Sequence, residues 1–163
     1  MKQLIDNRLR AGVIFLSVFV FLFLLFGSSF SDFVPSVSSF SDRISTSIPE
    51  KEASHKVQFT ASGDIPAGSK IKIFFEGSFI VHENMTSEEV DFFVNNAEKE
   101  LSSTLGEDIS KVDIKTGVEG EISIITADNL KIDDGDVIRI EIGKGLRKIE
   151  NPIDPGSYKI YLE

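Results

Sequence analysis

The chain has 163 residues, which is enough for one ordinary domain and an appended segment. It contains no cysteine, so disulfide bonds, thiolate chemistry and cysteine-ligated zinc are excluded. The formal net charge of −9 argues against nucleic acid as a partner, because neutralising phosphates requires clustered lysine and arginine.

The first ten residues differ in charge from the rest of the chain. Residues 1–10, MKQLIDNRLR, carry a net charge of +2, which, taken from the total of −9, leaves −11 on the remaining 153 residues. Lysine and arginine beside a membrane-spanning segment stay on the cytoplasmic side. We therefore predict that residues 1–10 are a cytoplasmic head and that the acidic body is extracellular.

The next segment, residues 11–27, reads AGVIFLSVFVFLFLLFG and contains no charged residue. A helix of this length is about 25 Å long, at the short end of what crosses a bilayer. We predict one N-terminal transmembrane helix, a signal-anchor that contacts membrane lipid through residues 11–27. Two alternatives remain open. Small residues at Ser29 and Ser31 suit a cleaved signal peptide, and cleavage near LRAG would leave the apolar helix to pack in a pilus-like filament.

Residues 28–42 are rich in serine and contain the pentapeptide SSFSD twice, at 28–32 and at 38–42. Serine-rich sequence with a single proline is typical of a linker. We predict that this segment is a spacer between the membrane and the body.

From residue 43 onward, apolar and polar residues alternate, which is the pattern of strands with one buried face. In HKVQFTA, for example, Val57, Phe59 and Ala61 fall on one side. Similar short runs follow, separated by turn-forming residues, as far as the final SYKIYL. The pattern predicts an all-β fold, an immunoglobulin-like antiparallel β-sandwich of seven to eight strands over residues 43–163.

One segment, residues 86–106, does not follow this alternation. Thr86 and Glu89 have capping-box spacing, and the apolar residues after them recur at helical intervals. On pattern alone the segment is a helix. The alternative is a strand hairpin made of VDFFV and KELSS.

The body resembles a family of β-sandwich domains found in surface proteins of uncultivated bacteria and some archaea. The matching stretches are ISTSIPEKEASHKVQFT, IPAGSKIKIFFEGSF, VDFFVNNAEKEL, GEISIIT, IDDGDVIRIEIG and IENPIDPGSYKIYL. The resemblance implies an extracellular module that is often repeated in larger proteins, and it favours strands over a helix at residues 90–101. This chain differs by carrying one copy directly after a membrane segment. The family supplies no catalytic or ligand residues that match positions here.

Two candidate sites follow from residue types. Asp128, Asp133, Asp134 and Asp136 supply the oxygen ligands that Ca²⁺ prefers, although their spacing is not that of an EF-hand and a plain turn explains them too. Asn84 begins the triplet NMT, an N-glycosylation pattern. His55 and His82 have no evident carboxylate partner, and we interpret both as surface or strand-end residues.

These observations predict a membrane-anchored, non-catalytic cell-surface module with a structural or adhesive role. The alternative is a subunit of a pilus-like filament with the apolar helix in its core. Expected partners are membrane lipid, envelope proteins or like subunits, with no nucleic acid. No cofactor is expected apart from the calcium considered above.

Overall fold

The computed structural model describes residues 36–154 and, for the backbone alone, residues 160–162. The predicted cytoplasmic head, the membrane segment at 11–27 and the first part of the spacer lie outside these residues. Within the described part, no helix has the length and apolar character needed to cross a membrane.

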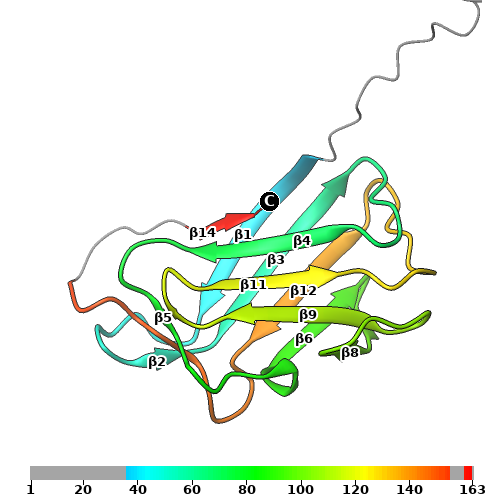
Figure 1. The fold of residues 1–163 in the computed structure, drawn as a ribbon. Coiled ribbons are helices and arrows are strands. Elements are labelled where there is room, and N and C mark those ends of the chain that lie inside the picture. The colour runs from blue at the N-terminus through cyan, green and yellow to red at the C-terminus, as the bar shows by residue number, and fades with distance from the viewer. Residues whose placement is uncertain (1–35, 155–159, 163) are drawn as a thin grey trace, which may run out of the picture. The chain divides into compact units, whose positions relative to one another are not determined.

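The described residues form three sheets, two of which are large (Figure 1). The first sheet is antiparallel throughout, and its strands in spatial order are β1(Ser36–Ile44), β3(His55–Ser62), β12(Val137–Ile142), β6(Val90–Val94) and β7(Ala97–Lys99). The second sheet contains β14(Ile160–Leu162), β4(Lys70–Phe75), β11(Glu121–Ile125), β9(Ser110–Lys115) and β8(Leu101–Ser102), with β8 parallel to β9.

A small third sheet and one helical turn complete the described elements. The small sheet contains β10(Gly117–Val118), β5(Ile80–Val81), β13(Ile149–Glu150) and β2(Glu52–Ala53), and the turn is the 3-10 helix η1(Ser87–Glu89). The described residues form fourteen strands, more than the predicted seven to eight, and seven of these strands have five or more residues. The all-β prediction is confirmed.

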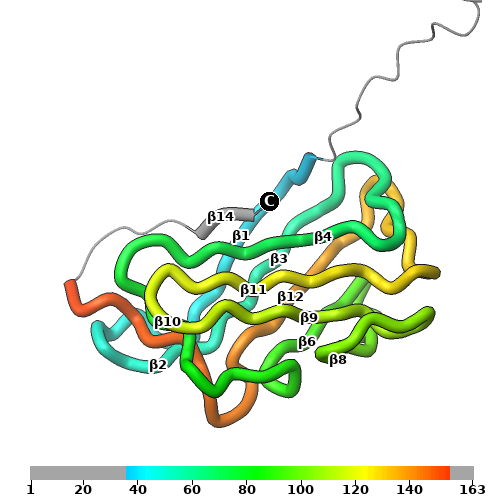
Figure 2. Tube along the Cα trace, viewed as in Figure 1, coloured from blue at the N-terminus to red at the C-terminus, as the bar shows by residue number. Residues whose placement is uncertain are grey.

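The two large sheets pack face to face as a sandwich, with β4, β11 and β9 in one layer and β1, β3, β12 and β6 in the other (Figure 2). The predicted alternation decides which side chains lie between them. Val57, Phe59 and Ala61 of β3 are all buried, as are Ile138, Ile140 and Ile142 of β12. Ile71, Ile73 and Phe75 close the core from the second sheet. Burying each such side chain stabilises the fold by about 1.5–3 kcal/mol.

The helix pattern at 86–106 is overridden. VDFFV forms the first strand of a hairpin, as the alternative expected, but its partner is β7(Ala97–Lys99), and of KELSS only Lys99 takes part, since Leu101–Ser102 form β8 in the second sheet. Strands β6 and β7 pair antiparallel and are joined by Asn95 and Asn96, whose φ angles are 51° and 65°. Two residues with positive φ form the tight turn that matches the twist of a hairpin, and asparagine tolerates it well. The capping-box residues are real, but they cap only the one turn of η1.

The spacer differs from its prediction. Strand β1 begins at Ser36 and pairs with β3 from Ser36 to Ile44, so the sandwich begins before residue 43. The serine-rich composition hides this strand because β1 has almost no buried face: eight of its nine residues are exposed. Pairing with the backbone of β3, rather than burial of side chains, makes this segment a strand.

The two lateral sides of the sandwich are built differently. A single residue, Glu100, joins β7 of the first sheet to β8 of the second, so the chain itself crosses between the layers there. On the opposite side, β1 and β14 end their sheets. That second side is where the predicted final strand lies, paired with β4 through Ile160, Tyr161 and Leu162.

Candidate functional site

The predicted calcium residues fall in two places. Asp133, Asp134 and Asp136 share the turn that precedes β12, whereas Asp128 is exposed in the turn before it. Asp136 uses one carboxylate oxygen to accept a hydrogen bond from the Asp133 N–H at 2.9 Å, and Asn95 Nδ2 donates to the other at 2.6 Å. These bonds close the turn locally, as Asp does in many turns.

The same turn is tied to the β3–β4 loop. Asp134 Oδ1 accepts a hydrogen bond from the Gly63 N–H at 2.7 Å, and the Asp134 N–H donates to Asp64 at 3.1 Å. Lys131 Nζ lies 2.6 Å from Asp133 and 2.8 Å from Asp64, and their carboxylates raise the pKa of the lysine. The ammonium of Lys131 in turn lowers the pKa of Asp64. The carboxylates of this turn therefore interact with backbone N–H groups and with the Lys131 ammonium.

No group of three or more acidic or histidine side chains in the described part of the chain is arranged to hold a metal ion. Asp64 belongs to the cluster and the sequence analysis missed it, because it lies some 70 positions away in the chain. These hydrogen bonds are those of a tight turn, and calcium binding at these residues stays a prediction.

Asn84 lies in the turn after β5 with its side chain exposed, as a modification site requires. Its backbone N–H donates to His82 Nδ1 at 3.1 Å. His82 is half-buried and directly follows strand β5, in agreement with its interpretation as a residue at a strand end.

His55 begins β3, as expected of a strand-end residue, but it is not a surface residue. Its exposed fraction is only 1%, and its Nδ1 lies 2.8 Å from Oδ2 of Asp42, the carboxylate partner that the sequence did not reveal. The ring also makes edge contacts with Phe75 and Phe79, with centroids 5.1 and 5.9 Å away. Recognising β1 as a strand would have placed Asp42 beside the start of β3.

The His55–Asp42 pair fastens the edge strand β1 to the core. Within the described residues, His55 Nε2 and Asp42 Oδ1 have no hydrogen-bond partner. A buried polar atom left in this way costs about 1–3 kcal/mol. A hollow of about 300 Å³ opens beside the end of β1, lined by Arg43, Ile44, Ser45, Ser54, His55, Lys56, Glu141, Ile142 and Lys144.

A second buried polar residue, Glu89, lies next to β6 at the same end of the first sheet as His55, because Val90 and His55 both pair with Ile142. Its carboxylate accepts hydrogen bonds from the N–H and hydroxyl of Thr86 at 2.8 and 2.7 Å, and Arg147 donates to it at 3.1 Å. The backbone carbonyl of Glu89 accepts the Gly143 N–H at 2.8 Å. Glu89 therefore holds the loop between β12 and β13 against η1.

The pKa of Glu89 reflects two opposing effects. Burial, the largest single effect, disfavours the charged form, but the bonds from Thr86 and the charge of Arg147 together outweigh it and lower the pKa. The carboxylate is thus a structural anion with all of its bonding within the protein.

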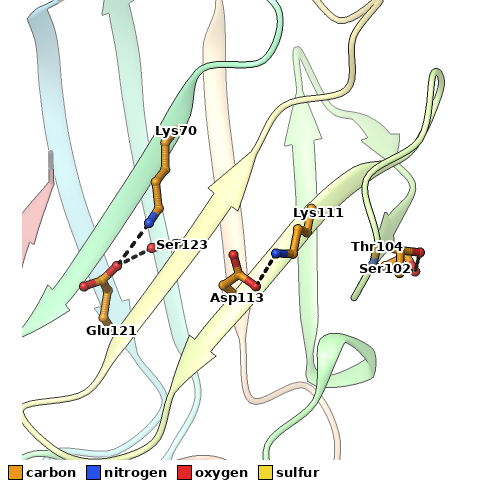
Figure 3. A network of polar contacts seen from close by, with 7 residues as sticks. All are labelled: Lys70, Ser102, Thr104, Lys111, Asp113, Glu121 and Ser123. Atoms are coloured by element: carbon orange, nitrogen blue, oxygen red, sulfur yellow. Dashed lines mark hydrogen bonds and ion pairs between the residues drawn. The ribbon is translucent and has the colours of Figure 1, made fainter.

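The outer face of the second sheet carries paired charges (Figure 3). Lys111 lies 2.9 Å from Asp113, Lys70 lies 3.9 Å from Glu121, and the Ser123 hydroxyl donates to Glu121. Opposite charges on neighbouring strands stabilise a sheet modestly. This face reads as a solvated surface whose charges are matched along and across strands.

The edge strand β1 is the most unusual surface among the described residues. Val37, Phe40 and Ile44 are each about 40% exposed, so three of the eight exposed large hydrophobic residues lie on this one strand. Its neighbour Ile48, in the following loop, is 58% exposed. Apolar side chains gathered in this way mark a surface where binding is favourable.

The described side chains thus form a packed interior, three internally bonded polar clusters and one exposed apolar edge. No catalytic residue was predicted from the sequence, and the four predicted calcium ligands are divided between two turns. Comparisons of the chain with models of protein families, with curated proteins and with solved structures found no match.

Proposed function

We propose that the protein is a membrane-anchored, non-catalytic cell-surface module with a structural or adhesive role. Residues 11–27 would be the anchor, with the N-terminus in the cytoplasm and the immunoglobulin-like sandwich outside. The resemblance to surface-protein domains and the contrast between a basic head and an acidic body support this proposal.

The short connection between the apolar segment and β1 gives this proposal its strongest support. Only eight residues, 28–35, separate the end of the apolar segment from the first residue of β1. Fully extended, such a connection spans at most about 30 Å. A sandwich tied this closely to an anchor would act at the membrane surface rather than at a distance from it.

The test is the intact mass of the native protein in separated membrane and medium fractions. We expect the full-length mass in the membrane fraction. A mass lacking about the first thirty residues, found in the medium, would indicate a cleaved signal peptide and contradict the anchor. A mass lacking the residues before Gly12 would favour the pilus-like filament instead.

The non-catalytic part of the proposal rests on the chemistry of the buried groups. The best-connected acid, Glu89, is bonded to Thr86 and Arg147, and His55 is enclosed by Asp42, Phe75 and Phe79. A general base needs to reach the proton that it removes from a substrate. Hydrolase activity of the purified protein that disappears in His55→Gln or Glu89→Gln, with the fold intact, would overturn this part.

A further inference from the structure

The exposed edges of the sheets are very unequal. β1 has nine residues, whereas the other strands that end the two large sheets, β7, β14 and β8, have three, three and two. Natural proteins keep their edge strands short or charged, because a free edge is a template for another strand. β7 follows this rule with Glu98 and Lys99, but residues 36–41 of β1 contain no charge and no proline.

The one feature that interrupts β1 is a bulge between Ser38 and Ser41, where Ser39 has a φ of 54°. The bulge divides β1 into two regular stretches, 36–38 and 41–44. Ser38 pairs with Thr60 and Ser41 pairs with Gln58, which is two residues away in β3. Ser38 and Ser41 therefore present their backbone groups in the same direction, although they are three residues apart.

This register makes β1 self-complementary. If a second copy approaches antiparallel about a two-fold axis between Ser39 and Phe40, Ser38 lies opposite Ser41 of the second copy and Val37 lies opposite its Asp42. Each opposed pair then has matching backbone orientation, and the two bulges face each other. A two-fold interface requires this kind of self-match.

The charges of β1 select the same arrangement. Its only charged residues, Asp42 and Arg43, lie at one end of the strand. Antiparallel pairing about this axis places them opposite Val37 and Ser36 of the second copy, whereas parallel in-register pairing would oppose Asp42 to Asp42 and Arg43 to Arg43. Like charges directly opposite each other destabilise a sheet.

We propose that β1 is a homodimer interface, in which the edge strands of two copies pair antiparallel about an axis between Ser39 and Phe40 and join their first sheets into one. Phe40 lies beside the axis in both copies, and Val37 becomes covered. Strand addition of this kind takes its affinity from main-chain hydrogen bonds and its selectivity from side chains such as these.

The absence of cysteine from the chain gives a direct test by cross-linking. Ser38→Cys and Ser41→Cys are single substitutions at exposed positions. Opposed residues of an antiparallel pair are about 4.5–5.5 Å apart between Cα atoms, within the range of a disulfide. In two Ser38→Cys chains the cysteines are offset by two strand positions, because the bulge places Ser38 and Ser41 opposite Thr60 and Gln58. That offset is about 7 Å along the strand, in addition to a strand separation of about 4.8 Å, so the Cα atoms lie more than about 7 Å apart, which is too far for a disulfide.

The full-length variants are expressed separately and together, and cells are treated with a mild oxidant before denaturing electrophoresis. The two variants together are expected to give a disulfide-linked dimer containing about half of the chains, because random two-fold pairing produces mixed pairs in that proportion. Each variant alone should give little. Ser103→Cys, exposed in the loop after β8, is the matched control for collisions.

Three results would overturn the proposal. If Ser38→Cys alone gave as much cross-linked dimer as the mixture, the strands would pair in parallel. If the mixture gave no more cross-linked dimer than Ser103→Cys, this edge would have another occupant, such as residues 28–34 of the same chain. A mixed cross-link unaffected by Phe40→Lys would show that the Phe40 side chain takes no part in the interface. The outcome is independent of the anchor, since the mass measurement decides the membrane question and cross-linking decides the pairing.

Discussion

Strands β3 and β1 are neighbours in one sheet, yet different interactions hold them. β3 alternates strictly, and its inward residues Val57, Phe59 and Ala61 are at most 2% exposed. β1 is exposed at every position but Asp42, which is half-buried. The comparison teaches that a strand of this fold is held either by its own apolar face or by a neighbouring backbone together with one buried polar contact.

The largest loss of stability should come from substituting a buried core residue of the first sheet. Ile140 is fully buried in β12, between β3 and β6, so Ile140→Ala should lower the free energy of unfolding by about 2–5 kcal/mol. The matched change on the edge, Val37→Ala, should cost less than about 1 kcal/mol. Chemical denaturation of the full chain in detergent measures both. Similar losses would show that the two strands are held in the same way.

The next effect concerns the polar fastening of β1. Asp42→Ala leaves Nδ1 of the buried His55 without its partner and should cost about 1–3 kcal/mol. Arg43→Ala, at the next and exposed position, should change stability by no more than about 0.5 kcal/mol. Hydrogen exchange of the β1 amides should rise in Asp42→Ala alone. Unchanged exchange would mean that backbone pairing suffices to hold the strand.

A smaller change in stability, one that depends on pH, is expected for Glu89. Because its pKa is lowered from 4.5 in the folded state, its contribution is complete above pH 4.5 and is lost as the pH falls through the lowered pKa. Glu89→Gln should lower the denaturation midpoint at neutral pH and flatten the loss below pH 4.5. The neighbouring exposed Glu88→Gln serves as the control, and an equal flattening there would contradict the assignment.

The smallest effect is expected at the acidic turn before β12. Its carboxylates already accept backbone N–H groups or lie beside Lys131, so millimolar calcium should leave the melting temperature unchanged. A calcium-dependent rise in the melting temperature that disappears in the double variant Asp133→Asn, Asp134→Asn would show that this turn binds calcium. Magnesium at the same ionic strength controls for screening.

The sequence predicted the structure best in strands where every second side chain is buried in the core. The alternation at residues 55–61 and 70–75 predicted both strands and their buried faces, because burial imposes a period of two. It was least informative where tertiary pairing replaces burial. β1 has almost no buried face, so its serines resembled a linker. The alternation of β6 is interrupted by Phe93, which faces outward, with its ring 4.0 Å from the guanidinium of Arg139.

The polar clusters could not be predicted for a related reason. Asp42 meets His55, Glu89 meets Arg147 and Asp64 meets Asp134 only after distant strands have paired. No pattern of neighbouring residues in the sequence predicts such contacts. The capping box of Thr86 and Glu89 is the exception, since its partners lie three residues apart, and it was visible in the sequence although its helix is a single turn.

The strand order of the first sheet has a consequence for synthesis of the chain. β3 ends at Ser62, but its inner neighbour β12 begins only at Val137, some 75 residues later. At typical rates of translation, about 5–20 residues per second, this interval lasts roughly 4–15 s. During that time β3 can pair with β1 alone, while Val57 and Phe59 wait for Ile138 and Ile140. Until β12 is synthesised, the inner edge of β3 therefore has no strand to pair with.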